Sequence, residues 1–492
     1  MDDIVLVGYF LSLTILFIFG CHGFVMIYYH RKYKGVKPTP KNEISTDSIV
    51  TIQLPLYNEM YVAERLINAV CEIDYPKEKL EIQVLDDSTD ETTNIVHQAV
   101  EQKKVEGFDI IHIRRGSRKG FKAGALKEAM KTAKGEFIAI FDADFIPHKD
   151  FLKETLSFFT DNNIGMVQTR WEHLNGDYSM LTKAQALALD GHFVIEQTVR
   201  NKAGFFINFN GTGGVWKKEC ILDAGNWNDD TLTEDLDLSY RAQLNGWKFV
   251  FLKDFTSPAE LPSEINALKN QQFRWTKGAI ETAKKILPKV WKSNIPLRVK
   301  LQSTFHLTNN LVFPFILLAA ILNVPLIFIK NSGSYEVYFA IMSLFVLAFV
   351  SSFLFYLYSQ KDIRTDWRKK IVLFPLFMAG SMGFAVNNSR AVIEGLLNRK
   401  SEFIRTPKFK VMNANDSGTG NKYLNTKIGL SVVVEVIMAL YCLVGIASSI
   451  YFVEIAALPF QILFFTGFSF VAFTSIKHAY HPRGFGVEKK IG

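Results

Sequence analysis

Acidic residues recur in pairs at points where an apolar run ends. Asp142 and Asp144 follow the run at 138–141, and Asp86 and Asp87 end an earlier one. Paired carboxylate oxygens can hold a hard divalent cation, which can in turn neutralise a diphosphate. Neither pair has a basic neighbour in the sequence, so the clustered carboxylates need a cation or a substrate beside them. Aspartates also occur in solvated turns, so the D-x-D pattern by itself leaves a simple turn open.

A basic segment offers the complementary chemistry. Residues 118–126 (RKGFKAGAL) combine three cations with two glycines where a helix is expected to begin. Exposed backbone N–H groups at such a point, together with Lys122, suit a phosphate group. An ordinary basic helix cap accounts for the same residues, and the segment alone does not decide between the two.

The segment TLTEDLDLSYRA at 231–242 carries a candidate general base. Thr231 and Glu234 have the spacing of a capping box, which predicts that a helix begins there. The helix dipole favours ionised carboxylates at this end, so Asp235 could remove a proton from a hydroxyl. Acids that simply open a helix are the alternative.

The stretch NQQFRWTKG at 270–278 combines an amide, a guanidinium and an indole. Helical spacing puts Gln271, Arg274 and Trp275 on one face. The first two can hydrogen-bond sugar hydroxyls or a diphosphate, and the indole can stack on a pyranose ring. The alternative is an amphipathic helix at a bilayer surface, with the tryptophan in the interface and the arginine snorkelling.

Strands and helices must position these groups, and they alternate from residue 49 to residue 171. This alternation predicts an open, mostly parallel α/β sheet with helices on both faces. Ligands of such sheets bind beyond the carboxyl ends of the strands, where the polar segments 55–59, 86–90 and 142–144 fall. The expected strands are 49–58, 80–88, 108–115, 136–144 and 165–171, and the expected helices lie near 60–72, 91–104 and 120–132.

Long apolar segments flank this soluble part. The 492 residues exceed one ordinary domain, and 48% hydrophobic with 21% charged residues indicates a membrane protein with a large soluble portion. The first apolar segment is interpreted as a signal anchor, because no basic region precedes it and no clear cleavage site follows it. The predicted spans are 4–29, 307–329, 335–358, 428–450 and 456–476.

Basic residues predict the orientation. Five lysines and arginines lie between residues 31 and 41, whereas Asp2 and Asp3 precede the first span, so the positive-inside rule places the soluble domain in the cytoplasm. A span at 371–387 would leave a strongly basic loop outside; a re-entrant or interfacial segment is predicted there, with six spans as the alternative. The expected divisions are an N-terminal transmembrane helix (1–30), a cytoplasmic domain (45–300), spans two and three (301–360), an interfacial or re-entrant part with a loop (365–427), spans four and five (428–478) and a cytoplasmic tail (479–492).

Charge and cysteine content exclude some classes. The net charge is +8, with much of the basic excess beside the predicted membrane spans, which suits anionic lipid rather than nucleic acid. The four cysteines have no spacing typical of a metal site or a disulfide framework, and a reducing cytoplasm suits them.

Together these motifs resemble those of the membrane-embedded family 2 glycosyltransferases of the cellulose synthase superfamily. The family's ordered signatures appear as DDSTD at 86–90, DAD at 142–144, TED at 233–235 and QQFRW at 271–275. Stretches such as QLPLYNE, KAGALKEAM and FNGTGGVW make the likeness closest to the cellulose-synthase-like A and C branch, which makes β-1,4-linked mannan, glucomannan or glucan. The resemblance covers about residues 50–280. It implies an α/β domain of the glycosyltransferase-A type, with a Rossmann-like mixed sheet, beside a helical transmembrane domain.

The resemblance also implies a role for each matched residue. Asp235 would be the catalytic base, and Asp142 and Asp144 would hold the donor diphosphate with Mg²⁺ or Mn²⁺. The donor-binding residues would be Asp86, Asp87, Lys122, Asp142, Asp144 and Arg274; the acceptor-binding residues would be Gly211, Thr212, Gly213, Glu234, Gln271 and Trp275.

One further segment, FIRTPK at 403–408, resembles the gating-loop motif of cellulose synthases. Phe403, Thr406 and Lys408 stand at corresponding positions, while the central residues differ from the family pattern. The loop therefore matches its family motif at fewer positions than the four core motifs match theirs.

The implied activity is that of an inverting, processive β-hexosyltransferase that uses UDP-glucose or GDP-mannose to extend a β-1,4-linked polysaccharide. A non-processive enzyme that glycosylates a membrane lipid, as ceramide glucosyltransferases do, remains the alternative. Five spans and Asn309 and Asn310 in the second span favour the polymer. A non-catalytic sensor would be expected to have lost some of the acids, and a glycoside hydrolase would leave the phosphate-type elements unexplained. The implied partners are a nucleotide sugar, a polysaccharide or lipid acceptor and the bilayer of a plasma, inner or Golgi membrane, with no nucleic acid.

Overall fold

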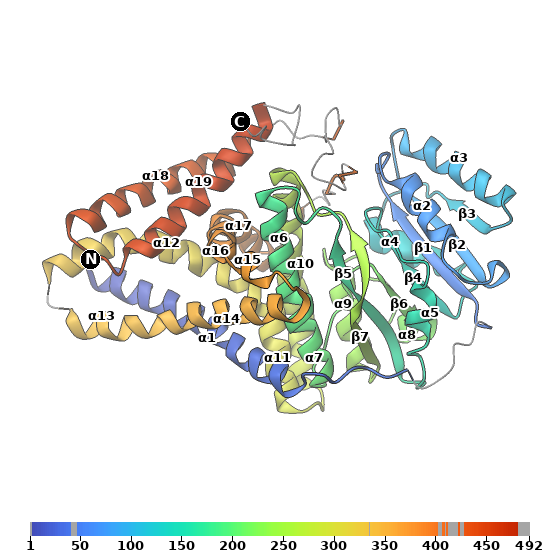
Figure 1. Cartoon of the computed structure of the whole chain (residues 1–492), viewed down its shortest axis with the longest axis horizontal. Coiled ribbons are helices and arrows are strands. Elements are labelled where there is room, and N and C mark those ends of the chain that lie inside the picture. Colours follow the sequence, from blue (N-terminus) through green and yellow to red (C-terminus); the bar gives the residue numbers. More distant parts are fainter. Residues whose placement is uncertain are drawn as a thin grey trace.

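The computed structural model describes residues 2–40, 47–333, 335–401, 406–408, 410–411, 422–423 and 428–480. An α/β domain adjoins a bundle of long helices, and Figure 1 shows the sheet at one end of the molecule and the bundle at the other. The predicted combination of a mixed α/β domain and a helical part is therefore confirmed.

Seven strands form one mixed sheet in the order β3-β2-β1-β4-β6-β5-β7. The first four strands are parallel, β6 is antiparallel to β4 and β5, and β7 is parallel to β5. The five predicted strands are present as β1 to β5, and β6 and β7 are additional. The bounds are β1 (Val50–Leu56), β2 (Leu80–Asp86), β3 (Asp109–Ile113), β4 (Phe137–Ile140), β5 (Ile164–His173), β6 (Gly214–Lys217) and β7 (Lys248–Ala259).

Alternating side chains fix the register of the sheet. On one face, Val50, Ile52 and Leu54 join the core beneath α2, α3 and α5; on the other, Ile138 and Ile140 join the core beneath α4, α8 and α9. A one-residue slip would turn these side chains to the wrong face, so the ends of β1, β2 and β4 are held together at one edge. The helix bounds are α2 (Ala63–Cys71), α3 (Thr92–Val105), α4 (Phe121–Ala129), α5 (Phe151–Leu156), α8 (Lys218–Asp223) and α9 (Glu234–Leu244).

Helix α9 begins later than the capping-box pattern predicts, so that prediction is wrong. Thr233 is the N-cap residue and makes no side-chain capping hydrogen bond. The long helix α10 (Ile265–Lys292) packs on this segment instead: a Cβ at Gly278 would lie 2.9 Å from the backbone nitrogen of Thr233. The backbone N–H of Leu232 donates to Glu281 Oε2 at 2.9 Å, so a tertiary contact replaces the local cap.

Among the described residues, five helical segments are long and apolar enough to cross a membrane, and each overlaps one predicted span; three predicted spans begin one or two residues too early. A further pair of helical segments, Trp367–Gly383 and Ala385–Leu396, is bent by 46° and fits either a broken span or a re-entrant loop. The predicted re-entrant element therefore stays a prediction, and the predicted tail lies almost wholly outside the described residues. The five spanning segments are α1 (Asp2–Lys32), Leu297–Ser332 with α11 and α12, Glu336–Ile363 with α13 and α14, α18 (Leu430–Tyr451) and α19 (Leu458–Tyr480).

Helix α10 ties the sheet domain to the bundle through two buried lysines. Lys269 Nζ lies 2.7 Å from Glu435 Oε2 of α18 and 3.1 Å from Ser475 Oγ of α19. Lys277, which is fully buried, pairs with Glu394 of α17 (Ala385–Leu396). Since a buried ammonium group without a partner is costly, these pairs fix α10 against helices that lie far along the chain.

Helix α16 (Phe374–Gly383) offers a matched test of how it packs on α19. A Cβ at Gly383 would lie 2.3 Å from the carbonyl oxygen of Gly467, whereas a Cβ at Gly380 would meet nothing within 4 Å. We expect Gly383→Ala to destabilise the protein by about 1–3 kcal/mol through overpacking, and Gly380→Ala to have no such effect. Thermal unfolding of the purified protein in detergent measures both. Equal shifts in the two variants would contradict this packing.

Candidate active site

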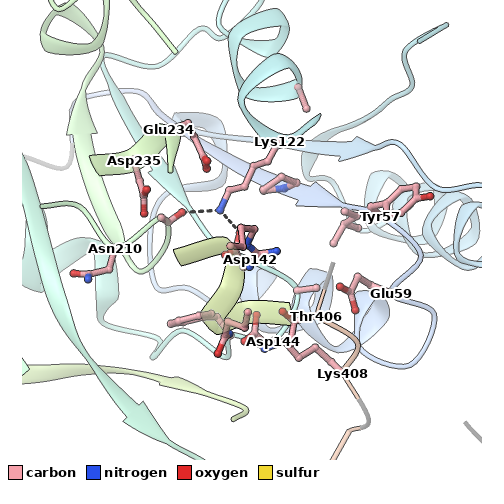
Figure 2. Close-up of a pocket in the computed structure, with 18 of the residues that line it drawn as sticks. Tyr57, Glu59, Lys122, Asp142, Asp144, Asn210, Glu234, Asp235, Thr406 and Lys408 are labelled. Atoms are coloured by element: carbon pink, nitrogen blue, oxygen red, sulfur yellow. Dashed lines mark hydrogen bonds and ion pairs between the residues drawn. The ribbon is translucent and has the colours of Figure 1, made fainter. Parts of the chain in front are cut away.

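The carboxyl ends of β1, β2 and β4 open into a cavity of about 180 Å³. Strand ends, the start of α9 and one face of α10 all contribute side chains to it, and Figure 2 shows several of them converging from these different elements. The cavity therefore lies beyond the carboxyl ends of the strands, where ligands of such sheets bind. The predicted residues that line the cavity are Asp87, Lys122, Asp142, Asp144, Gly211, Glu234, Asp235, Gln271, Arg274, Trp275, Thr406 and Lys408.

The ammonium group of Lys122 lies among the carboxylates of this cavity. Its Nζ donates to Asp142 Oδ1 at 2.5 Å and to the carbonyl oxygen of Gly211 at 2.9 Å (Figure 2). Burial alone would lower the pKa of Lys122, but the charges of Asp142, Glu234 and Asp235 raise it above its ordinary value. The lysine is therefore held as a cation where a diphosphate could bind.

The backbone before Lys122 is shaped for this position. Gly120 has a φ of 73° and a Cβ there would lie 2.7 Å from Asp229 Oδ2, so only glycine fits without a shift. Phe121 also has a positive φ, of 49°. These left-handed conformations start α4 directly beneath the D-x-D pair.

Each D-x-D carboxylate is paired with a lysine from another part of the chain. Asp142 pairs with Lys122, and Asp144 Oδ2 accepts from Lys408 Nζ at 2.5 Å. The sequence showed no basic neighbour beside these carboxylates, but the fold supplies one to each from elsewhere in the chain, so a cation or substrate is not needed to balance their charge. The backbone N–H of Asp142 also donates to Thr212 Oγ1 at 2.9 Å, which holds the strand end in place.

The D-x-D oxygens fit a divalent cation that arrives with a ligand. Asp142 Oδ2 and Asp144 Oδ1 have no hydrogen-bond partner among the described residues, and carboxylate oxygens are the ligands that Mg²⁺ and Mn²⁺ prefer. Within the same described part of the chain, no group of three or more histidine, cysteine, aspartate or glutamate residues could hold a metal. Two protein oxygens would therefore need phosphate oxygens and water to complete the coordination.

Two carboxylates stand side by side at the start of α9. Burial, followed by repulsion from the charge of Glu234, raises the pKa of Asp235 to about 7. Burial likewise raises the pKa of Glu234, although Lys122 opposes that shift. A Cβ at Gly211 would lie 3.1 Å from Asp235 Oδ2, so a glycine there keeps the approach to this carboxylate open. A carboxylate that titrates near neutral pH suits a general base.

The stretch NQQFRWTKG forms part of α10, and its three singled-out side chains face the cavity. Gln271, Arg274 and Trp275 line the cavity wall together. Burial lowers the pKa of Arg274, while the surrounding carboxylates, Glu234 first among them, oppose that shift. The structure thus brings the guanidinium, Lys122 and the acidic motifs to one place.

Some predicted site residues lie elsewhere. Asp86 is buried below the cavity, where Oδ2 lies 3.0 Å from His112 Nε2 and Oδ1 accepts from the backbone of Ser88. Thr212 and Gly213 lie behind the wall and support it, as the Thr212 contact with Asp142 shows. Phe403 lies outside the described residues.

Some residues in or next to the cavity were not predicted as site residues. Arg118 lines the cavity, and its guanidinium lies 3.3 Å from the centre of the Tyr57 ring. Arg115 does not line it, but its Nε donates to Oδ1 of the cavity residue Asp87 at 3.0 Å. Arg115 could have been found in the sequence, because it lies two residues after the end of β3 and ligands bind beyond the carboxyl ends of such strands. Asn210 belongs to the segment FNGTGG at 209–214, which the resemblance implies would line the acceptor pocket, and it does line the cavity; its amide lies 2.7 Å from Gln197 Nε2 and 3.1 Å from His192 Nε2. Glu59 completes this group.

A comparison with known protein families covers the part of the chain that contains this cavity. Residues 48–278 match the model of the "Glycosyltransferase like family 2" family. Residues 48–278 are a family 2 glycosyltransferase domain. The three acidic signatures and the Q-x-x-R-W signature all fall within this match.

Relatives of the glycosyltransferase domain point to one branch. A rice (Oryza sativa subsp. japonica) protein named "Probable glucomannan 4-beta-mannosyltransferase 7" is 46% identical over 243 residues, 48% of this chain and 42% of that protein. An Arabidopsis thaliana "Glucomannan 4-beta-mannosyltransferase 7" is 42% identical over 250 residues, 50% of this chain and 45% of the relative. The resemblance to the A branch is thus confirmed. The chain spans about half the length of these relatives.

A solved structure confirms the fold type. The mannosyltransferase PcManGT from Pyrobaculum calidifontis, in complex with GDP-Man and Mn²⁺, superimposes with a TM-score of 0.54 at 19% identity. The match covers 79% of this chain and all of that chain. The α/β part is therefore of the glycosyltransferase-A type, as predicted.

The free oxygens of the D-x-D pair lead to a metal-binding prediction. We expect Mn²⁺ to bind in the presence of GDP, and Asp142→Asn and Asp144→Asn each to weaken that binding about tenfold or more, because each removes one of two charged ligands. The electron paramagnetic resonance signal of free Mn²⁺ measures this. Asp150→Asn, an exposed acid shortly after the motif, serves as the control. Unchanged Mn²⁺ binding in both motif variants would show that the metal binds elsewhere.

Proposed function

We propose that the chain is an inverting, processive membrane β-mannosyltransferase that uses GDP-mannose to extend a β-1,4-linked polysaccharide. One observation carries the proposal: Lys122, the D-x-D pair and Asp235 share a cavity with Trp275, and Trp275 lies on a helix that is tied by buried lysines to helices of the bundle. The family match supports hexosyl transfer, and the names of the relatives support mannose as the sugar and β-1,4 as the linkage.

The reaction is a single displacement at the anomeric carbon. Asp235 accepts the proton of the acceptor hydroxyl, whose oxygen attacks the carbon from the face opposite the nucleoside diphosphate. The new carbon–oxygen bond forms as the bond to the phosphate oxygen breaks, so an α-linked donor gives a β-glycoside. Lys122 and Arg274 stabilise the negative charge that develops on the leaving diphosphate. A cation held by Asp142 and Asp144 would, when bound, neutralise part of the same charge.

The acceptor end would lie between Trp275 and Asp235. The Trp275 indole offers a flat apolar surface for a sugar ring, and Gln271 is one turn away for its hydroxyls. Asn210, held at both ends of its amide, can donate to or accept from another hydroxyl. Gly211 leaves room for the ring next to the base.

A lipid acceptor is the second candidate, and one feature favours it. An apolar cavity of about 110 Å³ lies beside Gln272 of α10, with Leu181, Phe313 and Phe377 in its wall. Such a wall suits an acyl chain more than a polysaccharide. A single sugar transferred to a lipid would be the product in that case.

We also propose the topology predicted from the charges. The glycosyltransferase domain would face the cytoplasm of an inner, plasma or Golgi membrane, with the bent pair Trp367–Gly383 and Ala385–Leu396 as a re-entrant element. The basic residues at Arg368, Lys369 and Lys370 support this orientation under the positive-inside rule.

Product analysis tests the function. We expect membranes that contain the chain to incorporate radiolabel from GDP-mannose, and not from UDP-glucose, into a polymer that endo-β-1,4-mannanase degrades. Asp235→Asn should reduce incorporation by about 10²–10⁴-fold, because it removes the base. Glu219→Gln, a change at an exposed acid of α8, should retain full activity. Radiolabel confined to a chloroform–methanol extract would favour the lipid acceptor instead.

The raised pKa of Asp235 predicts a pH dependence. A base with a pKa of about 7 is protonated below that pH, so kcat/KM should fall as the pH drops through 7. Glu234→Gln removes the neighbouring negative charge, which should lower the pKa of Asp235 and shift the inflection to a lower pH. Glu219→Gln should leave the inflection unchanged. An inflection that does not move in Glu234→Gln would rule out Asp235 as the titrating group.

A further inference from the structure

A second polar cavity lies where the glycosyltransferase domain meets the membrane helices. Its volume is about 120 Å³, and it shares no lining residue with the reaction cavity. The walls come from the segment after β5, from α6 (Met180–Asp190), from the end of α14 (Val346–Ile363) and from α15 (Trp367–Ile371). Figure 1 shows α15 between the bundle and the sheet domain.

From this cavity, we propose a binding site for the phosphate headgroup of an anionic membrane lipid. Lys183 and Lys370 would contact the phosphate, with Arg364 and His173 beside them. Neither the reaction nor the family resemblance uses any of these four residues.

The acidic groups of the cavity are already neutralised. Asp190 is buried; its Oδ1 lies 3.2 Å from His173 Nε2, and its Oδ2 accepts from Gln360 Nε2 at 3.0 Å and lies 3.3 Å from Arg364 Nη2. Because both oxygens are occupied by protein groups, this carboxylate does not compete for the two lysines. The other acid, Asp177, has a side chain that is 70% exposed.

The lysines have charge to spare for an anion. The ammonium group of Lys183 makes no ion pair or hydrogen bond with any described residue, whereas the backbone N–H of this lysine donates to the carbonyl oxygen of Ser179. Among the described residues, Lys370 forms an ion pair with Asp177 alone, and a pair with so exposed a carboxylate contributes little free energy. The side chain of His173 is only 3% exposed, and its Nδ1 atom has no hydrogen-bond partner in the described part of the chain. When the imidazole is protonated, that nitrogen is a donor for a phosphate oxygen.

The surroundings favour a lipid over a free anion. The apolar helix α14 ends at Ile363, and Trp367 follows with Lys361 and Arg368 over its ring, at 5.8 and 5.4 Å. Tryptophan flanked by cations is typical of the membrane–water boundary. Leu373 lies in the cavity wall directly before the apolar α16, so a headgroup at Lys183 would have apolar helix surface beside it for its acyl chains. Basic pockets between membrane helices bind anionic headgroups by the same physics.

Lipid titration of the purified full-length chain, followed by native mass spectrometry, tests the site. The probes are dioctanoyl phosphatidic acid, dioctanoyl phosphatidylcholine and inorganic phosphate. We expect the wild type to bind phosphatidic acid at least about tenfold more tightly than phosphatidylcholine. The double variant Lys183→Gln/Lys370→Gln should lose about thirtyfold in affinity for phosphatidic acid, because it removes both ammonium groups.

The matched control removes the same charge outside the cavity. Lys361→Gln/Arg368→Gln alters two neighbouring cations that do not line it, and should change affinity by less than about twofold. If both double variants lose affinity equally, only diffuse surface charge attracts the lipid and the site is wrong. If inorganic phosphate binds as tightly as phosphatidic acid, the cavity takes a free anion and the lipid assignment is wrong.

A single variant guards against misfolding. Because the ammonium group of Lys183 contacts no polar partner in the part of the chain that the structure describes, Lys183→Gln should keep the unfolding temperature of the wild type while it weakens phosphatidic acid binding about fivefold. Unchanged binding in this folded variant would overturn the proposal.

Discussion

Three carboxylates, those of Asp142, Glu234 and Asp235, surround the ammonium group of Lys122 at the edge of the sheet, and this cation stabilises their ionised forms. Asp142, Glu234 and Asp235 all act on the pKa of this lysine, and only the first contacts it directly. The lysine therefore neutralises one acid by contact and lowers the energy of ionising the other two through space. The strained start of α4 and the glycine at 211 both serve to place one nitrogen atom. Without it, Arg274 would be left to oppose the mutual repulsion of these acids, and their pKa values would rise further.

A second constraint fixes the position of the Q-x-x-R-W motif relative to the membrane helices. Helix α10 presents Gln271, Arg274 and Trp275 to the cavity, and its neighbouring lysines to the membrane bundle. Because Lys269 and Lys277 are tied to α18 and α17, α10 cannot shift relative to the bundle without breaking a buried ion pair. The Q-x-x-R-W motif is thus held at a fixed depth relative to the membrane helices. Its closeness to the apolar segments, visible in the sequence, is a positional requirement of the site.

Patterns of neighbouring residues predicted the features that depend on neighbouring residues, namely the strands and the polar groups at their ends. The strands with continuous apolar runs and the acids at their ends were recognisable, so Asp87, Asp142 and Asp144 were found. Strands β4 and β6 both have four residues, but only β4 is followed by the acidic D-x-D pattern that marks it in the sequence; β7 has a register shift after Thr169 of its partner, which interrupts its alternation. The start of α9 was misplaced because Gly278 and Glu281 act on it from another helix. The Asp144–Lys408 pair spans 264 positions, a separation over which no sequence pattern extends.

The buried pair of Lys269 and Glu435 also imposes an order on biosynthesis. The two residues are 166 positions apart, so α10 emerges from the ribosome long before its partner exists. Until α18 is inserted, Lys269 must stay hydrated, and the segment with the Q-x-x-R-W motif cannot settle at its final depth. The reaction cavity is therefore complete only after α18 and α19 have been made. A nascent chain that ends before α18 already contains the residues that line the cavity, but it lacks the ion pair that fixes the α10 residues among them.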